Sequence, residues 1–260
     1  MSPSDWQGSE SYSQEGEDMI LRRIFEKKPH GFYVDVGAHH PIRFSNTYYC
    51  YKRGWFGINI EPNPSTCVLF KAVRRIDIHL QLGVSDSPGE LTYYQFNEPA
   101  MNTFDGQSVQ ASLAKNRYHV KSTCQVPVDR LDRILNSHLP DGTLIDFLSI
   151  DVEGLDLAVL KSNDWERYRP TCVLIEILQS SLEDMMSNEV YGFMKTQQYM
   201  LYAKTCNTAF FLDGLSSSGT VSASFSGSNA NQRTTMDQSD IQIESRSLME
   251  RQSEQCFQLP

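Results

Sequence analysis

The sequence predicts an α/β fold built on a largely parallel, doubly wound sheet. Several short apolar segments have the length of strands, and most are separated by helical or turn-rich connections. The central segments are almost continuously apolar, which is typical of strands buried on both faces. At 260 residues the chain is long enough for one domain of this class with a well-filled core.

The expected elements follow in chain order. Residues 17–25 carry apolar side chains at helical spacing and predict a helix that leads into the sheet. The predicted core strands are 32–36, 56–60, 76–84, 145–150, 172–177, 199–203 and 209–212. Residues 91–96 and 124–128 predict a small β insertion between the third and fourth core strands. Residues 97–121 lack clear periodicity and predict a long loop, either over a binding site or on the ordinary surface.

The composition changes abruptly after Asp213. Residues 214–260 are rich in Ser, Gln and Asn and carry too few apolar side chains to repay the entropy of ordering. We therefore expect a folded domain at 1–213 and a disordered tail at 214–260. The sequence leaves open whether the tail is a tether, a partner-binding segment or without function.

The charge pattern disfavours nucleic acid as a partner. The net charge is −9, and basic residues occur only as short clusters at 22–23, 27–28 and 74–75, which we expect to be solvated helix ends. No run approaches the roughly 20 apolar residues of a membrane span, and the N-terminus lacks the pattern of a signal peptide. The expectation is a soluble, cytoplasmic protein, and the oligomeric state stays open.

The most informative segment contains two strands, each followed by a distinctive turn. The first apolar run ends at Gly37, and the second ends at Glu61, about 24 residues later. A small-residue turn lets a ligand approach the backbone, and an acidic side chain at the tip of the next strand can accept both hydroxyls of a ribose. This arrangement is typical of sites for adenosine cofactors.

The first turn lacks the features of a dinucleotide site. A pyrophosphate needs Gly-x-Gly-x-x-Gly at a helix N-terminus, whereas Gly37 is followed by Ala38 and two histidines. S-adenosylmethionine carries no phosphate, and Asp35 beside a single glycine suits its zwitterionic methionine end. The sequence therefore favours S-adenosylmethionine over a nicotinamide dinucleotide.

Several motifs in a fixed order resemble the FkbM-type S-adenosylmethionine-dependent methyltransferases. They are residues 13–18, 34–39, 45–47, 54–57, 60–64, 83–86, 126–129 and 150–154, and the similarity spans roughly 11–213. The resemblance implies a Rossmann-like class I methyltransferase fold with a terminal antiparallel strand. It also implies methyl transfer, commonly to a hydroxyl of a sugar or another small metabolite, so the expected acceptor is a small molecule or a glycan.

In a doubly wound sheet, ligands bind at the carboxyl ends of the strands. The residues expected to bind the donor are Asp35, Gly37, Ala38, Glu61, Ser85 and Asp86. Glu61 is expected to bind the ribose, Asp35 and Gly37 the methionine end, and Ser85 and Asp86 to lie near the adenine. Each carboxylate has an ordinary alternative: Glu61 as an exposed strand-end acid, Asp35 as a cap, and Asp86 as the start of a turn.

Transfer to an oxygen usually needs a general base. The predicted catalytic residues are His39, Asp151 and Glu153, with His40 as an alternative to His39. The histidines can instead bond only to the chain, and the two carboxylates can instead organise their turn. Glu176 ends a neighbouring strand and could share magnesium with Asp151, but two carboxylates do not define a site, so no metal ligand is predicted.

Two other classes of function stay open. A non-catalytic interaction module would keep the fold without the chemistry, and the tail is compatible with it. A nicotinamide-dependent oxidoreductase is disfavoured by the missing glycines. The pairs Ser13-Gln14 and Asn46-Thr47 either touch a ligand or cap helices.

Overall fold

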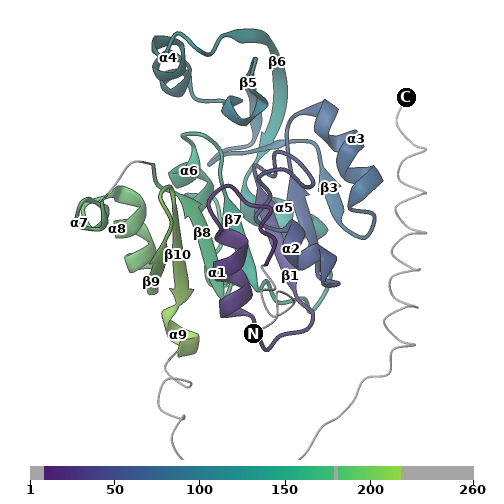
Figure 1. The fold of residues 1–260 in the computed structure, drawn as a ribbon, viewed down its shortest axis with the longest axis vertical. Helices are drawn as coiled ribbons and strands as arrows, with labels where there is room; N and C mark the ends of the chain where they lie inside the picture. Colours follow the sequence, from purple (N-terminus) through teal and green to yellow (C-terminus); the bar gives the residue numbers. More distant parts are fainter. Residues whose placement is uncertain (1–8, 179–180, 218–260) are drawn as a thin grey trace, which may run out of the picture. The chain divides into compact units, whose positions relative to one another are not determined.

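A computed structural model describes residues 9–178 and 181–217, which form a seven-stranded sheet and a smaller three-stranded sheet (Figure 1). The main sheet contains β1 (Phe32–Val36), β2 (Phe56–Ile60), β3 (Ile78–Leu80), β7 (Phe147–Ile150), β8 (Cys172–Glu176), β9 (Tyr199–Lys204) and β10 (Thr208–Asp213). The strand order is β3-β2-β1-β7-β8-β10-β9; β10 pairs antiparallel with both β8 and β9, and the other described pairs in this sheet are parallel. The predicted α/β class, with a largely parallel sheet and an antiparallel last strand, is confirmed.

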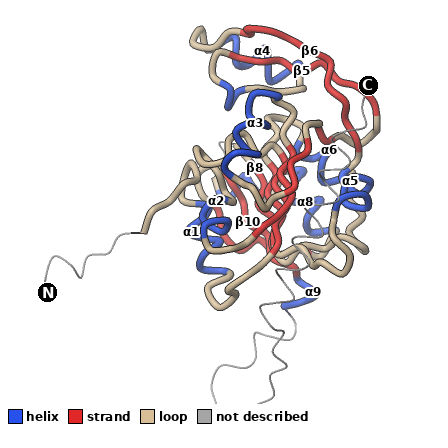
Figure 2. Tube along the Cα trace, turned by 90° about the vertical axis from the view of Figure 1, so that its right-hand side faces the viewer, coloured by secondary structure: helices blue, strands red, loops and turns tan. Residues whose placement is uncertain are grey.

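Helices cover both faces of the main sheet (Figure 2). On one face, α1 (Glu17–Ile24) and α2 (Tyr48–Lys52) bring Leu21 and Cys50 against Tyr33 of β1. On the other face, α5 (Leu131–His138), α6 (Asp156–Lys161) and α8 (Glu189–Thr196) pack on the side of Val34. Successive residues of β1 thus enter opposite cores, which is why this strand is apolar without alternation.

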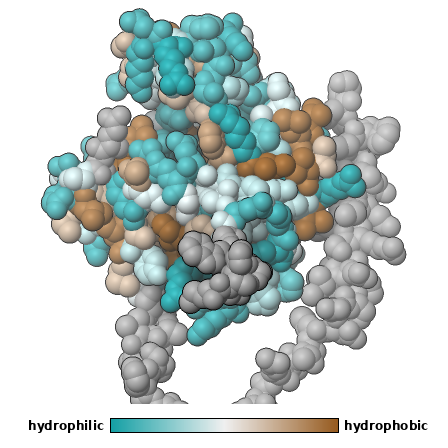
Figure 3. Space-filling view, in the orientation of Figure 1, coloured by the Kyte–Doolittle hydropathy of each residue, from teal (hydrophilic) through white to brown (hydrophobic). Residues whose placement is uncertain are grey.

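Three further helices are α3 (Pro64–Val73), α7 (Leu182–Met185) and α9 (Gly214–Ser217). The first two begin at residues whose side chains cap them, and the third follows the last strand. The helix α3 starts after Asn63, whose side chain accepts a hydrogen bond from the Ser65 N–H. The short α7 starts with a capping box at Ser181. The last described helix is α9, directly after β10. Apolar side chains gather on the surface over α3 (Figure 3).

The second sheet is the predicted β insertion. It contains β4 (Gly83–Val84), β5 (Gly89–Phe96) and β6 (Val120–Asp129), in the order β4-β6-β5. The strands β5 and β6 form an antiparallel pair, and η2 (Pro99–Met101) and α4 (Gly106–Ala114) lie between them in the chain. We call residues 89–129 the insertion. Its outer surface is mainly hydrophilic (Figure 3), whereas Tyr93 and Phe96 are buried.

Two sequence predictions need correction. The predicted strand 76–84 is two strands, because the chain leaves the main sheet after Leu80 and Gly83 then pairs with Val128 of β6. The predicted loop 97–121 contains η2 and α4, and Asp105 caps α4 by accepting hydrogen bonds from two backbone N–H groups. Few side chains of α4 are buried, so the sequence lacked a helical period there. Of the predicted tail at 214–260, residues 214–217 form α9 and residues 218–260 lie outside the described residues.

Candidate active site

A crevice lies at the carboxyl ends of the central strands, where the sequence predicted the ligand site. The strands of the main sheet and the turns that follow them contribute Asp35, Gly37, Ala38, Glu61, Asp151, Glu153 and Glu176 to the lining. The insertion contributes Tyr93, Thr103 and Phe104. The structure therefore brings both predicted groups, the donor residues after β1 and β2 and the acidic residues after β7, to one cavity.

The turn after β1 is fixed by backbone geometry. Gly37 has a φ of 80°, and its N–H donates to the carbonyl of Ile60 over 3.0 Å. Ala38 donates to the same carbonyl over 3.2 Å. A Cβ at position 37 would overlap the carbonyl oxygen of Asp151, so both the conformation and the space require glycine.

Glu61 is held in place by two backbone donors. One carboxylate oxygen accepts from the His39 N–H over 2.8 Å, and the other accepts from the Asn63 N–H over 2.8 Å. The residue is only 6% exposed, which rules out the alternative of a solvated strand-end acid. Burial raises the pKa of Glu61 to about 7, against the lowering effect of these hydrogen bonds. The Tyr93 hydroxyl also donates to the oxygen that Asn63 holds, over 3.5 Å, so the other oxygen keeps a further lone pair that a ligand hydroxyl can use.

Asp35 is buried behind the glycine turn. Its carboxylate accepts a hydrogen bond from the Thr47 hydroxyl over 2.9 Å, and Asn46 donates to Ser149 on the adjacent strand over 3.1 Å. Burial raises the pKa of Asp35, and the Thr47 bond acts in the opposite direction. The motif 45–47 therefore serves mainly to orient Asp35; Asn46 also lines the crevice, and Thr47 makes no side-chain cap on α2.

The Thr47 hydroxyl is in turn fixed by Arg74. This guanidinium is fully buried, donates to the hydroxyls of Ser45 and Thr47 over 2.8 and 3.2 Å, and lies 3.6 Å from Asp77. The expectation that the basic pair 74–75 is a solvated helix end is wrong for Arg74. A buried network with one cation at its centre supports the donor side of the crevice.

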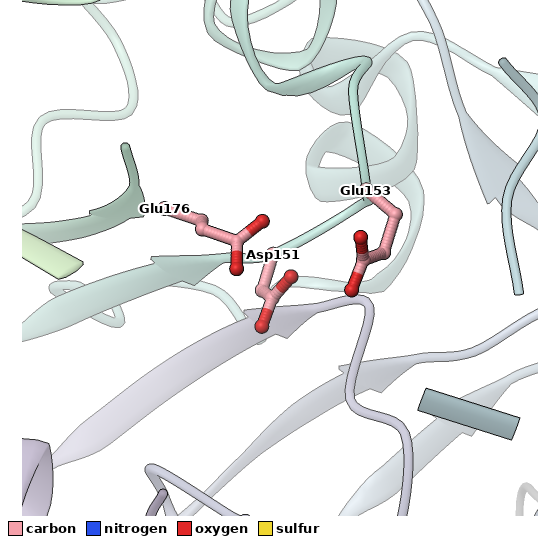
Figure 4. A group of neighbouring side chains, drawn as sticks. All are labelled: Asp151, Glu153 and Glu176. Atoms are coloured by element: carbon pink, nitrogen blue, oxygen red, sulfur yellow. The ribbon is translucent and has the colours of Figure 1, made fainter. Parts of the chain in front are cut away.

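Three carboxylates meet at the other side of the crevice (Figure 4). Asp151 directly follows β7, Glu153 lies two residues further, and Glu176 ends β8; one oxygen from each lies within 4.8 Å of the others. Among the described residues, no side chain or backbone N–H donates a hydrogen bond to these three carboxylates. Shared protons or a divalent cation are the two ways in which such a group can lower its repulsion.

The pKa values of the three carboxylates reflect this crowding. Loss of hydration and the neighbouring Glu153 raise the pKa of Asp151 well above its usual range. Burial and the charge of Asp156 raise the pKa of Glu153 to about 7, and burial and the charge of Asp151 raise that of Glu176 to about 10. These pKa values correspond to a group that retains protons at neutral pH.

Other residues organise the turn that carries Asp151 and Glu153. Asp156 accepts hydrogen bonds from the N–H groups of Val152 and Gly154, both over 3.2 Å. The Thr103 hydroxyl of the insertion donates to the backbone carbonyl of Glu153 over 2.8 Å. Since these contacts hold the turn, the alternative in which Asp151 and Glu153 themselves organise it has no support, and both carboxylates face the crevice.

The two histidines lie in surroundings that lower their pKa values. His39 lines the crevice, but burial and the nearby Arg43 lower its pKa to about 4, so it is a weak base at neutral pH. Its ring stacks on Phe44 at a centroid distance of 6.3 Å. His40 accepts hydrogen bonds from two backbone N–H groups of its own loop through Nδ1. The geometry favours the carboxylates over either histidine as the base.

Ser85 and Asp86 are not among the residues that line the crevice. Ser85 follows β4 and donates its N–H to the carbonyl of Asp129, while Asp86 is exposed. The lining there comes instead from Leu82, Gly83 and Val84. The predicted contact of Ser85 and Asp86 with an adenine therefore has no support in this geometry.

Two groups of lining residues were not named individually from the sequence, although the loop 97–121 was considered as a cover of a binding site. The first group belongs to the insertion: Tyr93, Asn102, Thr103 and Phe104. The second group is Glu15 and Asn207, which come from opposite ends of the described chain. Glu15 accepts hydrogen bonds from the N–H and the side-chain amide of Asn207 over 2.8 and 2.7 Å. No local pattern announces contacts between residues so far apart in sequence. Gln14 lines the crevice, whereas Ser13 bonds to Asp18 near the start of α1.

Comparison with known proteins gives one family match. No curated protein matches the chain. Of the described helices, none is both long and apolar enough to cross a membrane. Residues 35–201 match the family described as the Methyltransferase FkbM domain; this range begins inside β1 and includes β2, β7 and the turns that follow all three strands. The match covers more than half of the chain, which therefore belongs to the FkbM methyltransferase family.

Proposed function

We propose that this methyltransferase uses S-adenosylmethionine and methylates a hydroxyl group of a sugar or another small metabolite. The family match supports the reaction class. The placement of Glu61 is the observation that carries the choice of donor. The cluster of Asp151, Glu153 and Glu176 supports transfer to an oxygen, because a hydroxyl must lose a proton during the reaction.

Glu61 fits a ribose for a geometric reason. Its two oxygens are fixed by the N–H groups of His39 and Asn63, and the residue lines the crevice next to the glycine turn. A carboxylate fixed in this way can accept hydrogen bonds from two vicinal hydroxyls if the long bond from the Tyr93 hydroxyl gives way at one oxygen. The turn offers no glycine-rich cradle for a pyrophosphate, so an adenosine without a phosphate fits better than a dinucleotide.

The acceptor is expected to bind between the donor and the carboxylates of Asp151, Glu153 and Glu176. The donor supplies an activated methyl group, and the protein must hold the acceptor oxygen in line with it. Such positioning can lower a barrier by roughly 7–11 kcal/mol. With a pKa of about 7, Glu153 is suited to take the hydroxyl proton near neutral pH.

Calorimetric titration tests the donor site. The wild-type protein is expected to bind S-adenosylmethionine at micromolar concentration and not to bind NAD. Glu61→Gln should weaken binding by roughly 10- to 100-fold, as expected for loss of a charged hydrogen bond of about 1.5–3 kcal/mol. Glu90→Gln, an exposed change in the insertion, is the control. Tight binding of NAD, or no binding of either cofactor, would contradict the proposal.

A second measurement separates catalysis from a non-catalytic interaction module. Formation of S-adenosylhomocysteine should be followed with a panel of hydroxylated sugars. Asp151→Asn and Glu153→Gln should reduce turnover of any accepted sugar by tenfold or more, while binding of the donor changes little. Donor binding without transfer to any member of the panel would favour the non-catalytic alternative.

A further inference from the structure

We propose that the insertion supplies the adenine-binding surface of the donor site, with Tyr93 and Phe104 as the residues that contact the base. This inference rests on the proposed function, since it concerns the same donor. It assigns a binding role to a part of the chain that contains none of the residues expected to bind the donor, and it replaces the contact predicted for Ser85 and Asp86.

The two aromatic side chains form one continuous surface in the crevice. Tyr93 comes from β5 and is 4% exposed, while Phe104 lies between η2 and α4. Their ring centroids are 4.8 Å apart with an interplanar angle of 43°, and both residues line the crevice. A flat aromatic base packs well on surfaces of this kind.

The position of this pair relative to Glu61 matches an adenosine. The Tyr93 hydroxyl donates to a Glu61 carboxylate oxygen over 3.5 Å, so the aromatic surface begins next to the expected ribose ligand. In an adenosine, the base is attached directly to the ribose. A ribose held by Glu61 therefore brings its base to the side of the crevice where Tyr93 and Phe104 lie, rather than to the acidic group after β7.

The chain at β4 leaves space for the Phe104 ring. A Cβ on Gly83 would lie 2.7 Å from the Phe104 ring, so the glycine of β4 makes room for the ring. Leu82 and Val84 flank Gly83 and also line the crevice. Apart from Glu61, the side chains named in this part of the lining are uncharged, as an adenine requires.

The backbone that carries Phe104 is fixed from two directions. Thr103 exchanges two backbone hydrogen bonds with Tyr94, over 2.9 and 3.2 Å, and its hydroxyl donates to the Glu153 carbonyl. The aromatic surface is thus attached both to β5 and to the turn after β7. A surface that is already ordered loses little conformational entropy when a ligand binds.

Binding of two ligands to aromatic variants tests the inference. S-adenosylhomocysteine and adenosine should be titrated into wild type, Phe104→Ala and Tyr93→Ala. Each variant should bind both ligands about tenfold or more weakly, in line with the loss of a base–aromatic contact. Because the contact is with the base, the factor should be similar for the two ligands.

Matched variants control for general damage to the insertion. Tyr93→Phe keeps the ring and should bind both ligands within about threefold of wild type, given the length of the hydroxyl's bond to Glu61. Tyr94→Ala changes the next residue of β5, which does not line the crevice, and should leave binding unchanged. Cooperative thermal unfolding of every variant is required for the comparison.

Three outcomes would overturn the inference. The first is unchanged affinity of folded Phe104→Ala for both ligands. The second is weaker binding of S-adenosylhomocysteine with unchanged binding of adenosine, which would place the rings at the methionine end. The third is wild-type protein that binds neither ligand, and this result alone would also contradict the proposed function.

Discussion

Gly37 lies directly against the backbone carbonyl of Asp151, so the turn that follows β1 and the turn that follows β7 touch through their main chains. The first of these turns is the expected donor site, and the second carries two of the three clustered carboxylates. The distance between the expected donor site and these carboxylates is therefore fixed by two adjacent strands and by a contact between backbone atoms. This arrangement suits a reaction in which small displacements are costly.

The contact predicts that Gly37→Ala is strongly destabilising. The added methyl group would overlap the Asp151 carbonyl, and the left-handed φ of 80° would be strained for alanine. A loss of roughly 2–4 kcal/mol in the free energy of unfolding is expected from strain and overlap. Urea denaturation measures it. Gly192→Ala in α8, where a Cβ meets no atom within 4 Å, should instead stabilise the protein by roughly 0.5–1 kcal/mol.

Donor binding should depend on pH through Glu61. Its pKa of about 7 means that the carboxylate is ionised above neutral pH and protonated below it. Only the ionised form offers both oxygens as acceptors, so the Kd for S-adenosylhomocysteine should rise about tenfold between pH 8 and pH 6. Calorimetry at several pH values checks this. In Glu61→Gln the same interval should show little change; an equal slope in both proteins would assign the titration to another group.

Neutralising Glu176 should stabilise the protein at alkaline pH. Its folded-state pKa of about 10 lies above the ordinary value of 4.5, so the native state binds the proton more tightly than the unfolded state. The resulting stabilisation is complete below pH 4.5 and is lost as pH rises towards 10. Glu176→Gln should therefore raise the free energy of unfolding at pH 8 by roughly 1–3 kcal/mol and have little effect at pH 4.

The control for this change is Glu166→Gln, which alters an exposed glutamate. It should leave the stability unchanged at both pH values. Thermal unfolding at pH 4 and pH 8 gives the comparison. Equal effects of Glu176→Gln at the two values would show that the side chain is not held with a raised pKa.

Removing the buried cation Arg74 should cost more than any surface change. Arg74→Met would leave Asp77 buried without its ion-pair partner, and losses of about 3–5 kcal/mol are typical for such changes. The double variant Arg74→Met with Asp77→Asn should recover part of this loss, because the unpaired charge is gone. Denaturant titration of the two variants measures the difference; a double variant no more stable than Arg74→Met would argue against the ion pair.

Local sequence patterns were sufficient for the central strands and the donor turn. The predicted limits of β1 and β2 agree with the structure, because strands buried on both faces leave an unmistakable apolar run. Gly37 and Glu61 were found for a related reason: each directly follows such a strand. The proximity of Asp151 and Glu176 also followed from strand ends that meet at one edge of a sheet.

Features that depend on distant contacts could not be predicted in this way. Arg74 stands in a basic pair, and only the packing of α3 against the motif 45–47 shows that it is buried. Tyr93 and Phe104 belong to an insertion whose position over the crevice is set by pairing between β4 and β6. Glu153 was expected beside Asp151, but its backbone φ of 53° is a conformation that its residue type does not announce.

The place of β10 in the sheet has a practical consequence for any fragment of this protein. The family match ends at residue 201, yet β10 lies between β8 and β9 and supplies hydrogen bonds to both. A fragment trimmed to the matched residues would lose this inner strand, expose the edge of β8 and remove Asn207, the partner of Glu15. The part of the chain that defines the family is therefore smaller than the part that must be expressed to fold.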